Sequence, residues 1–187
     1  MTIILTVPQT ESSAALRLRP WRPADLPSLV AAHRDPGLRC WLTAPLHDET
    51  DARNWLHAQA AGWTARTRFS FAVVTDSHDG PLVGHTLLKV VDTDIAEVGY
   101  WTAAHARSRG IAARALEAMS RWALNEQDMI EPTRLDLLHE EDNGASCRVA
   151  EKCGFALREL LPAAPPAFPN KGHRHIRTAT RIRPHRR

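Results

Sequence analysis

Apolar residues recur at every second position in several short stretches of the chain, and this pattern is typical of half-buried strands. Residues 16–19 alternate between leucine and arginine, and residues 174–183 alternate in a similar way. With the turn residues between them, such stretches predict strands at 16–19, 69–75, 82–91, 95–102, 134–138, from 154 onward and at 174–183.

Apolar residues at helical spacing separate some of these strands. Ile111, Ala115, Leu116 and Met119 fall on one face of a helix. The same spacing and the flanking residues predict helices at 25–33, 51–63, 110–125 and 145–153. Asp35-Pro36-Gly37 predicts a stop and turn, residues 76–80 a hairpin turn, and the proline-rich residues 161–169 a loop.

Together these elements predict an α/β fold (α+β in some schemes), in which a mixed sheet carries helices on both faces. A length of 187 residues with 43% hydrophobic residues suits one domain spanning 1–187. Within it we expect an N-terminal extension over 1–13, a proline-rich loop over 161–170 and a basic strand and tail over 171–187.

Targeting signals and thiols bear on the compartment. No apolar run approaches the ~20 residues that a membrane span needs, and residues 1–7 lack the basic start of a signal peptide. Cys40, Cys147 and Cys153 are an odd set with no paired metal-ligand spacing. We therefore predict a cytoplasmic protein with reduced thiols and no membrane partner.

Charge is unevenly distributed along the chain. The formal net charge is +3, yet residues 171–187 hold Lys171 and six arginines and no acid, so the rest of the chain is net acidic. A basic end can contact nucleic acid. It is also compatible with a closing strand that has a solvated arginine face.

The most informative segment is the turn at Arg107-Ser108-Arg109-Gly110, which lies between a predicted strand and a predicted helix. The first turn of a helix carries free N–H groups and partial positive charge, so it binds anions. Gly110 lets the backbone approach a phosphate closely, and the arginines add charge-assisted hydrogen bonds. This arrangement indicates a site for the pyrophosphate of a nucleotide-like cofactor.

The pattern Arg107-x-x-Gly110-x-Ala112 resembles the pyrophosphate-binding signature of the GNAT (Gcn5-related) N-acetyltransferases. Residues 16–26 and the segment from Asn143 to Phe155 resemble the first strand and last helix of the ribosomal-protein N-terminal acetyltransferase branch. The resemblance covers about residues 16–160. It implies the GNAT fold, whose mostly antiparallel sheet splays open between its fourth and fifth strands, and acetyl-CoA as the co-substrate in that gap.

The resemblance also implies which residues bind the cofactor. The pyrophosphate would lie on the turn and first helical residues, and backbone groups of the preceding strand would bind the thioester and the pantetheine arm. Asn143 would bond the pantetheine, cap the last helix, or do both. The expected cofactor-binding residues are Val98, Gly99, Tyr100, Arg107, Ser108, Arg109, Gly110, Ile111, Ala112 and Asn143.

For the chemistry we expect Glu97 as the general base and Ser146 as the general acid. Glu97 is also compatible with a solvated strand residue or an ion pair, and Ser146 with hydrogen bonding at a helix start. Many relatives carry a tyrosine acid one turn before the Gly-Phe pair, where this chain has Ala150. Tyr100, the one tyrosine, belongs to a different element.

Acceptor contacts are expected from Trp41, Trp101 and His139, the last of which begins an acidic stretch. His173-x-His175 suggests a metal pair but lacks a third ligand at a plausible spacing, so we predict no metal.

The function predicted is an acetyl-CoA-dependent N-acetyltransferase acting on a protein N-terminus or a small-molecule amine through a ternary complex. Two alternatives stay open: acyl transfer with an RNA-linked partner such as an aminoacyl-tRNA, and a non-catalytic CoA-binding module. The chain is expected to be a monomer or a homodimer.

Overall fold

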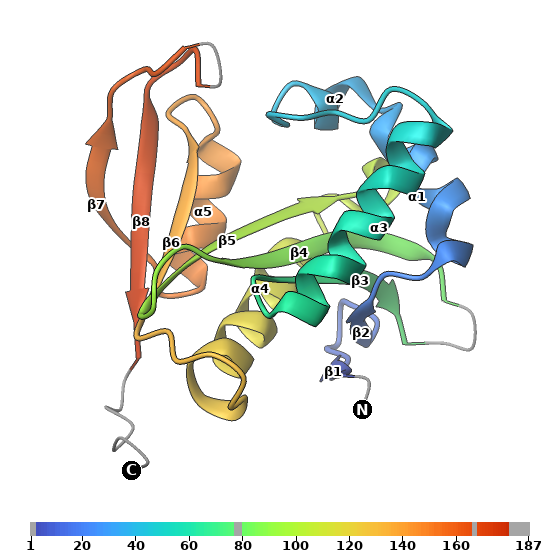
Figure 1. The fold of residues 1–187 in the computed structure, drawn as a ribbon, viewed down its shortest axis with the longest axis horizontal. Coiled ribbons are helices and arrows are strands. Elements are labelled where there is room, and N and C mark those ends of the chain that lie inside the picture. The colour runs from blue at the N-terminus through green and yellow to red at the C-terminus, as the bar shows by residue number, and fades with distance from the viewer. Residues whose placement is uncertain (1–2, 77–79, 166–167, 180–187) are drawn as a thin grey trace.

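Residues 3–76, 80–165 and 168–179 are described by a computed structural model. Within these ranges eight strands form one sheet in the order β1-β2-β3-β4-β5-β6-β8-β7 (Figure 1). Neighbouring strands are antiparallel except for the parallel pair β5 and β6, which confirms the mixed, mostly antiparallel sheet. The strands are β1 (Leu5–Val7), β2 (Leu16–Pro20), β3 (Arg68–Thr75), β4 (Leu82–Val90), β5 (Ile95–Thr102), β6 (Arg134–Glu140), β7 (Ala156–Leu161) and β8 (Gly172–Thr178).

The sequence pattern missed β1, which lies inside the predicted N-terminal extension. This strand is three residues long and pairs antiparallel with β2, with Leu5 opposite Leu18. Three residues are too few for an alternation to be recognised. The predicted closing strand is seen as β8 up to Thr178, whereas residues 180–187, with four of the C-terminal arginines, lie outside the described residues. The centre of the predicted hairpin turn, residues 77–79, also lies outside them.

Helical segments separate or flank the strands, in chain order η1 (Pro23–Asp25), α1 (Leu26–His33), α2 (Pro36–Arg39), α3 (Glu49–Ala65), η2 (Ala104–Ala106), α4 (Ile111–Arg121), η3 (Trp122–Glu126) and α5 (Gly144–Lys152). None of those in the described ranges has the length and apolar character that crossing a membrane requires. After Arg121 the predicted long helix continues as the wider, π-helical turn η3.

The predicted stop at residues 35–37 is confirmed, since α1 ends at His33, but the predicted turn is wrong, because the short helix α2 begins there. The side chain of Asp35 caps it by accepting a hydrogen bond from the Gly37 N–H at 3.2 Å. Pro36 occupies the first helical position, where its missing N–H removes no helical bond. The Asp-Pro pair therefore starts a helix here as well as ending α1.

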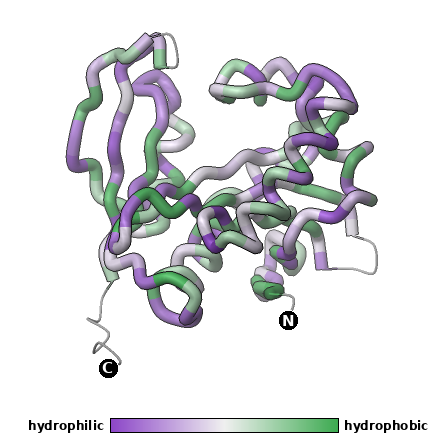
Figure 2. Tube along the Cα trace, in the orientation of Figure 1, coloured by the Kyte–Doolittle hydropathy of each residue, from purple (hydrophilic) through white to green (hydrophobic). Residues whose placement is uncertain are grey.

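Helices cover both faces of the sheet (Figure 1). Val98 of β5 belongs to the core that contains the apolar face of α4, with Leu116 and Met119. Trp101, three residues further, belongs to a second core formed with α1, α2 and α3. Figure 2 shows hydrophobic and hydrophilic positions interleaved along the strands and helices, as this two-sided burial requires.

A gap in the sheet follows from the length of the parallel pairing. β5 pairs with β6 from Ile95 opposite Arg134 to Val98 opposite Leu137. Beyond that point β5 stays paired with β4 up to Thr102, while β6 stays with β8 up to Glu140. The two halves of the sheet therefore diverge (Figure 1). Counted from the strand at Leu16, this opening lies between the fourth and fifth strands.

Candidate functional site

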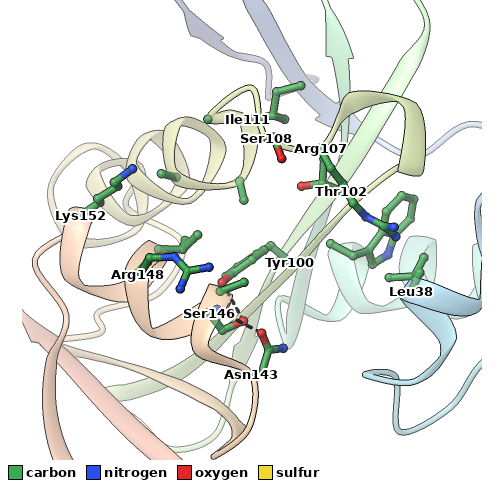
Figure 3. Close-up of a pocket in the computed structure, with 17 residues that line it drawn as sticks. Leu38, Tyr100, Thr102, Arg107, Ser108, Ile111, Asn143, Ser146, Arg148 and Lys152 are labelled. Atoms are coloured by element: carbon green, nitrogen blue, oxygen red, sulfur yellow. Dashed lines mark hydrogen bonds between the residues drawn. The ribbon is translucent and has the colours of Figure 1, made fainter.

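A cavity of about 440 Å³ opens where β5 and β6 separate (Figure 3). Its walls come from α2, the end of β5, the turn into α4, and α5. Most of the residues expected to bind a cofactor meet here although they are spread along the chain. Of the site residues named from the sequence, the cavity is lined by Tyr100, Trp101, Arg107, Ser108, Gly110, Ile111, Ala112, Asn143 and Ser146.

The turn before α4 has an unusual backbone. Ser108 and Gly110 both adopt positive φ, 62° and 69°, and this left-handed conformation is strained for the serine and easy for glycine. The N-cap of α4 is Gly110, and no capping side-chain hydrogen bond is seen there within the described residues, so the first N–H groups of the helix are free of an internal acceptor. A Cβ built on Gly110 meets no atom within 4 Å. The glycine is therefore needed for its φ, and the space above it is open to a ligand.

Positive charge surrounds this turn. Arg107 forms an ion pair with Asp35, which ties the turn to the start of α2. Arg148 and Lys152, both exposed on α5, line the same cavity and form no ion pair within the described part of the chain. The sequence analysis missed these two cations. Helical spacing was the available signal, since Ala145, Arg148 and Lys152 recur at the three- and four-residue intervals of one helix face.

A chain of hydrogen bonds runs along the cavity floor (Figure 3). The Tyr100 hydroxyl donates to Ser146 Oγ at 3.0 Å, and the Ser146 N–H donates to Asn143 Oδ1 at 3.1 Å. Burial, only partly opposed by the bond to Ser146, raises the pKa of Tyr100 to about 12, because the phenolate is poorly solvated there. Tyr100 therefore stays protonated at neutral pH. The chain's one tyrosine comes from β5, not α5, yet its hydroxyl reaches the serine.

Three expected residues lie beside the cavity lining. Val98 is buried in the core under α4, and Gly99 is paired with Leu87 of β4. Arg109 is exposed, and its carbonyl accepts a hydrogen bond from the Ser13 hydroxyl at 3.0 Å. From Gly99 onward, no strand within the described ranges pairs with the β6-facing edge of β5. That edge can offer backbone groups to an extended ligand.

Glu97 also lies outside the cavity lining. Its carboxylate is 3.3 Å from Lys89 Nζ on the neighbouring β4, and its side chain is 35% exposed. Alternation along β5 turns Glu97 to the face opposite Val98 and Tyr100. The expected role of Glu97 as a base stays a prediction.

A second cavity, of about 580 Å³, is lined by chain segments that adjoin those lining the first. The turn after α2 supplies Trp41, which is 43% exposed, and the end of β6 supplies His139 and Glu140. Glu140 accepts a hydrogen bond from the Asn170 side chain at 3.0 Å. Lys171 also lines this cavity, and most of the remaining wall is apolar, with Leu42 and Phe168 among it. Apolar walls with a carboxylate suit an amine that carries an apolar group.

Trp101 is 7% exposed and packs in the core under α1, with its ring centroid 6.1 Å from that of Trp21 and 5.7 Å from that of His85. Its small exposed surface forms part of the lining of the first cavity. Of the two tryptophans expected to contact the acceptor, only Trp41 presents a large free surface.

Comparisons with known proteins agree with this geometry. The family model described as "Acetyltransferase (GNAT) domain" matches residues 15–156. A comparison with curated protein sequences finds no match.

Solved structures with the same architecture include a GNAT-family acetyltransferase from Bacillus anthracis, with a TM-score of 0.80 and 17% identity over 96% of this chain and all of the other. RimJ from Mycobacterium smegmatis, in complex with CoA-disulfide, gives a TM-score of 0.76 and 20% identity over 95% of this chain and 87% of the other.

The microcin self-immunity acetyltransferase MccE, in complex with acetyl-CoA and AMP, gives a TM-score of 0.74 and 15% identity over 87% of this chain and 92% of the other. At these identities the structural similarity establishes the fold.

Proposed function

Because this chain belongs to the GNAT acetyltransferase family, we propose that it transfers an acetyl group from acetyl-CoA to a primary amine by direct attack in a ternary complex. The observation that carries the proposal is the uncapped start of α4, with its open space above Gly110, at the edge of a cavity lined by Arg107, Arg148 and Lys152. Free N–H groups and cations around an empty space are what a pyrophosphate needs.

The pyrophosphate of acetyl-CoA would bind at residues 108–112, with Arg148 and Lys152 on the opposite wall. The pantetheine arm would then follow the unpaired edge of β5 beyond Val98, where strand-like backbone groups can bond its amides. This path leads past Tyr100 to the hydroxyl of Ser146, so the thioester would lie near the Tyr100–Ser146 pair. RimJ and MccE, whose solved complexes contain CoA-disulfide and acetyl-CoA, support this choice of co-substrate.

In the reaction the nitrogen of the neutral amine attacks the thioester carbon, and the tetrahedral intermediate expels the thiolate of CoA. The amine loses a proton and the thiolate gains one, so the step is balanced without another reactant. Ser146 is proposed as the donor to the thiolate, with Tyr100, held neutral by its raised pKa, replenishing it through their hydrogen bond. Glu97 is retained as the proposed base, acting through water.

The acceptor is proposed to enter from the second cavity. Gly37 and Leu38 line the first cavity, and the residues from Cys40 to Thr43 line the second. Likewise Ser146 lines the first and Glu140 the second. Residues 37–43 and 140–146 thus border both cavities, and this supports a path for an amine from the second cavity to the first. Glu140 would attract the ammonium group and Trp41 would contact its apolar neighbour.

The test is release of free thiol from acetyl-CoA in the presence of pooled amines, with peptides that carry free N-termini in one pool and small-molecule amines in the other. We expect turnover with one pool and saturable CoA binding by calorimetry. CoA binding with no turnover of any amine would favour the non-catalytic module. A folded protein that fails to bind CoA would overturn the proposal.

A further inference from the structure

Four side chains of metal-ligating types meet where α5 packs on β6 and β8. His139 comes from β6, Cys147 from α5, and His173 and His175 from β8. One ligand atom from each lies within 4.8 Å of the ligand atoms of the other three. Cys147 Sγ is 3.2 Å from His173 Nδ1 and 3.6 Å from His139 Nε2.

The fold explains how these residues meet. In the antiparallel pairing of β6 with β8, His139 stands directly opposite His173, and His175 is the diagonal neighbour two positions along. Opposed residues point to the same face of a sheet. α5 packs on that face, since Ala150 and Cys153 share a core with Leu137 of β6. A cysteine on the first turn of α5 is thereby brought over the three imidazoles.

The hydrogen bonds of two imidazoles direct their free nitrogens inward. His139 Nδ1 lies 2.7 Å from the Glu140 carbonyl, and His175 Nδ1 lies 3.4 Å from the Phe155 carbonyl. A carbonyl accepts only, so each Nδ1 is the protonated nitrogen and each Nε2 carries a lone pair. Metal-bound histidines are oriented in this way, by donating the other N–H to a carbonyl.

His175 supplies an independent observation. This residue is 1% exposed, and its buried Nε2 has no hydrogen-bond partner among the described residues. A buried polar atom without a partner loses the hydrogen bond that water would have given it. His139 Nε2 carries a lone pair of its own and Cys147 offers a weak S–H donor, and a cation shared by the four side chains would satisfy His175 Nε2.

We propose that His139, Cys147, His173 and His175 form a four-coordinate Zn²⁺ site. Zinc takes nitrogen and sulfur ligands in a tetrahedron, in which neighbouring ligand atoms stand ~3.4–3.6 Å apart. The two sulfur–nitrogen distances lie close to that spacing. With four protein ligands there is no open position for a substrate, so the site is structural.

Zinc there would tie α5, which packs on the sheet through side chains, to β6 and β8, which already pair with each other. It would fix α5, which carries Ser146 beside the cofactor cavity, to β6 and β8. It would also engage the Nε2 of His139, whose ring lines the acceptor cavity, so His139 would shape that wall without binding substrate. The metal site does not depend on the proposed acetyl transfer.

The experiment uses the full chain, stripped with a chelator and kept reduced with a phosphine. Zn²⁺ affinity is measured by competition with a chromophoric chelator, and Co²⁺ is used as a spectroscopic probe. We expect one zinc per chain, a Co²⁺ spectrum with a thiolate charge-transfer band, and a melting temperature that rises with zinc. Zinc binding weaker than about 1 µM would overturn the proposal, because structural sites bind far more tightly.

The diagnostic variants are Cys147→Ser and His173→Gln. Each should weaken zinc binding at least ~10-fold, and Cys147→Ser should also abolish the charge-transfer band. Matched controls are Cys40→Ser and His57→Gln, which alter an exposed thiol and an exposed imidazole elsewhere. Circular dichroism without metal verifies folding. Equal loss in the controls, or unchanged binding in folded Cys147→Ser, would refute the assignment.

Discussion

Removing the two hydroxyls of the Tyr100–Ser146 pair, singly and together, tests the proposed proton donor most directly. The Tyr100 hydroxyl donates to Ser146 Oγ at 3.0 Å, which leaves the serine's own proton free to point into the cavity. Since the raised pKa of Tyr100, about 12, keeps it neutral, the pair should act as a donor throughout the neutral range. The variants are Tyr100→Phe, Ser146→Ala and the double variant.

The magnitudes follow from the type of contact. Loss of a positioned general acid costs ~10²–10⁴-fold in rate, so Ser146→Ala should lower kcat by about 100-fold. Tyr100→Phe removes one neutral hydrogen bond, which contributes about 1 kcal/mol, and should lower kcat about fivefold. The double variant should have the same kcat as Ser146→Ala, because the Tyr100 hydroxyl acts only by returning a proton to Ser146.

The assay is thiol release at saturating amine, with the Kd for CoA measured separately by calorimetry. Thr64→Ala is the control, because it also removes one hydroxyl. Thr64 lies at an exposed position of α3, where its hydroxyl donates to the Ala60 carbonyl at 3.2 Å. The reasoning fails if Ser146→Ala keeps kcat within twofold of the wild type. It also fails if Tyr100→Phe lowers kcat equally in both backgrounds, since independent effects mean that the two hydroxyls do not act together.

Three further predictions follow from single residues. Gly110→Glu should abolish CoA binding in calorimetry, through steric block and charge repulsion. The control Gly154→Glu, which has the same φ of 69° but lies outside the cavity, should leave the Kd for CoA unchanged. Normal CoA binding by a folded Gly110→Glu protein would contradict the assigned site. Glu97→Gln should lower turnover more at acidic than at alkaline pH, where free amine is abundant, and an identical loss at every pH would argue for the Lys89 ion pair as its only role. Burial lowers the pKa of His85 to about 3, and Trp21 Nε1 lies 3.1 Å from its Nδ1. The unfolded chain therefore binds this proton more tightly than the folded one. The free energy of unfolding should have its full value above pH 6.5 and should fall as the pH drops toward 3. Measured by urea unfolding, the free energy of unfolding should fall less steeply with pH in His85→Asn than in the wild type, by up to ~1.4 kcal/mol per pH unit for one proton. Equal slopes in the two proteins would refute the lowered pKa of His85 as the cause.

Local patterns predicted most of the strands and helices, because alternation and helical spacing are properties of neighbouring residues. Residues 95–102 form β5 as predicted, and the turn before α4, singled out from Arg107 and Gly110, lines the first cavity. Errors arose where a local signal was short or had two meanings. β1 is too short to show a period, and Asp35-Pro36 starts α2 as readily as it ends α1.

Side-chain partners across the sheet were beyond the sequence pattern. Tyr100 was predicted to belong to a different element from Ser146, and it does, yet their hydroxyls bond at the cavity floor. Glu97 is on the expected strand, but its ion pair with Lys89 depends on the register of β4. Helical spacing places Arg148 and Lys152 on one face of α5, but only the structure shows that this face borders the cavity.

The sequence by itself determined most of the strands and helices and pointed to the turn that we propose binds a phosphate, since these depend on side chains a few positions apart. The tertiary structure alone decided where β5 and β6 separate, which hydroxyls and cations share the opening, and that His139 and Cys147 join His173 and His175. The physical reason is that strand register and helix packing are fixed by the burial of the whole apolar surface, which no single segment encodes.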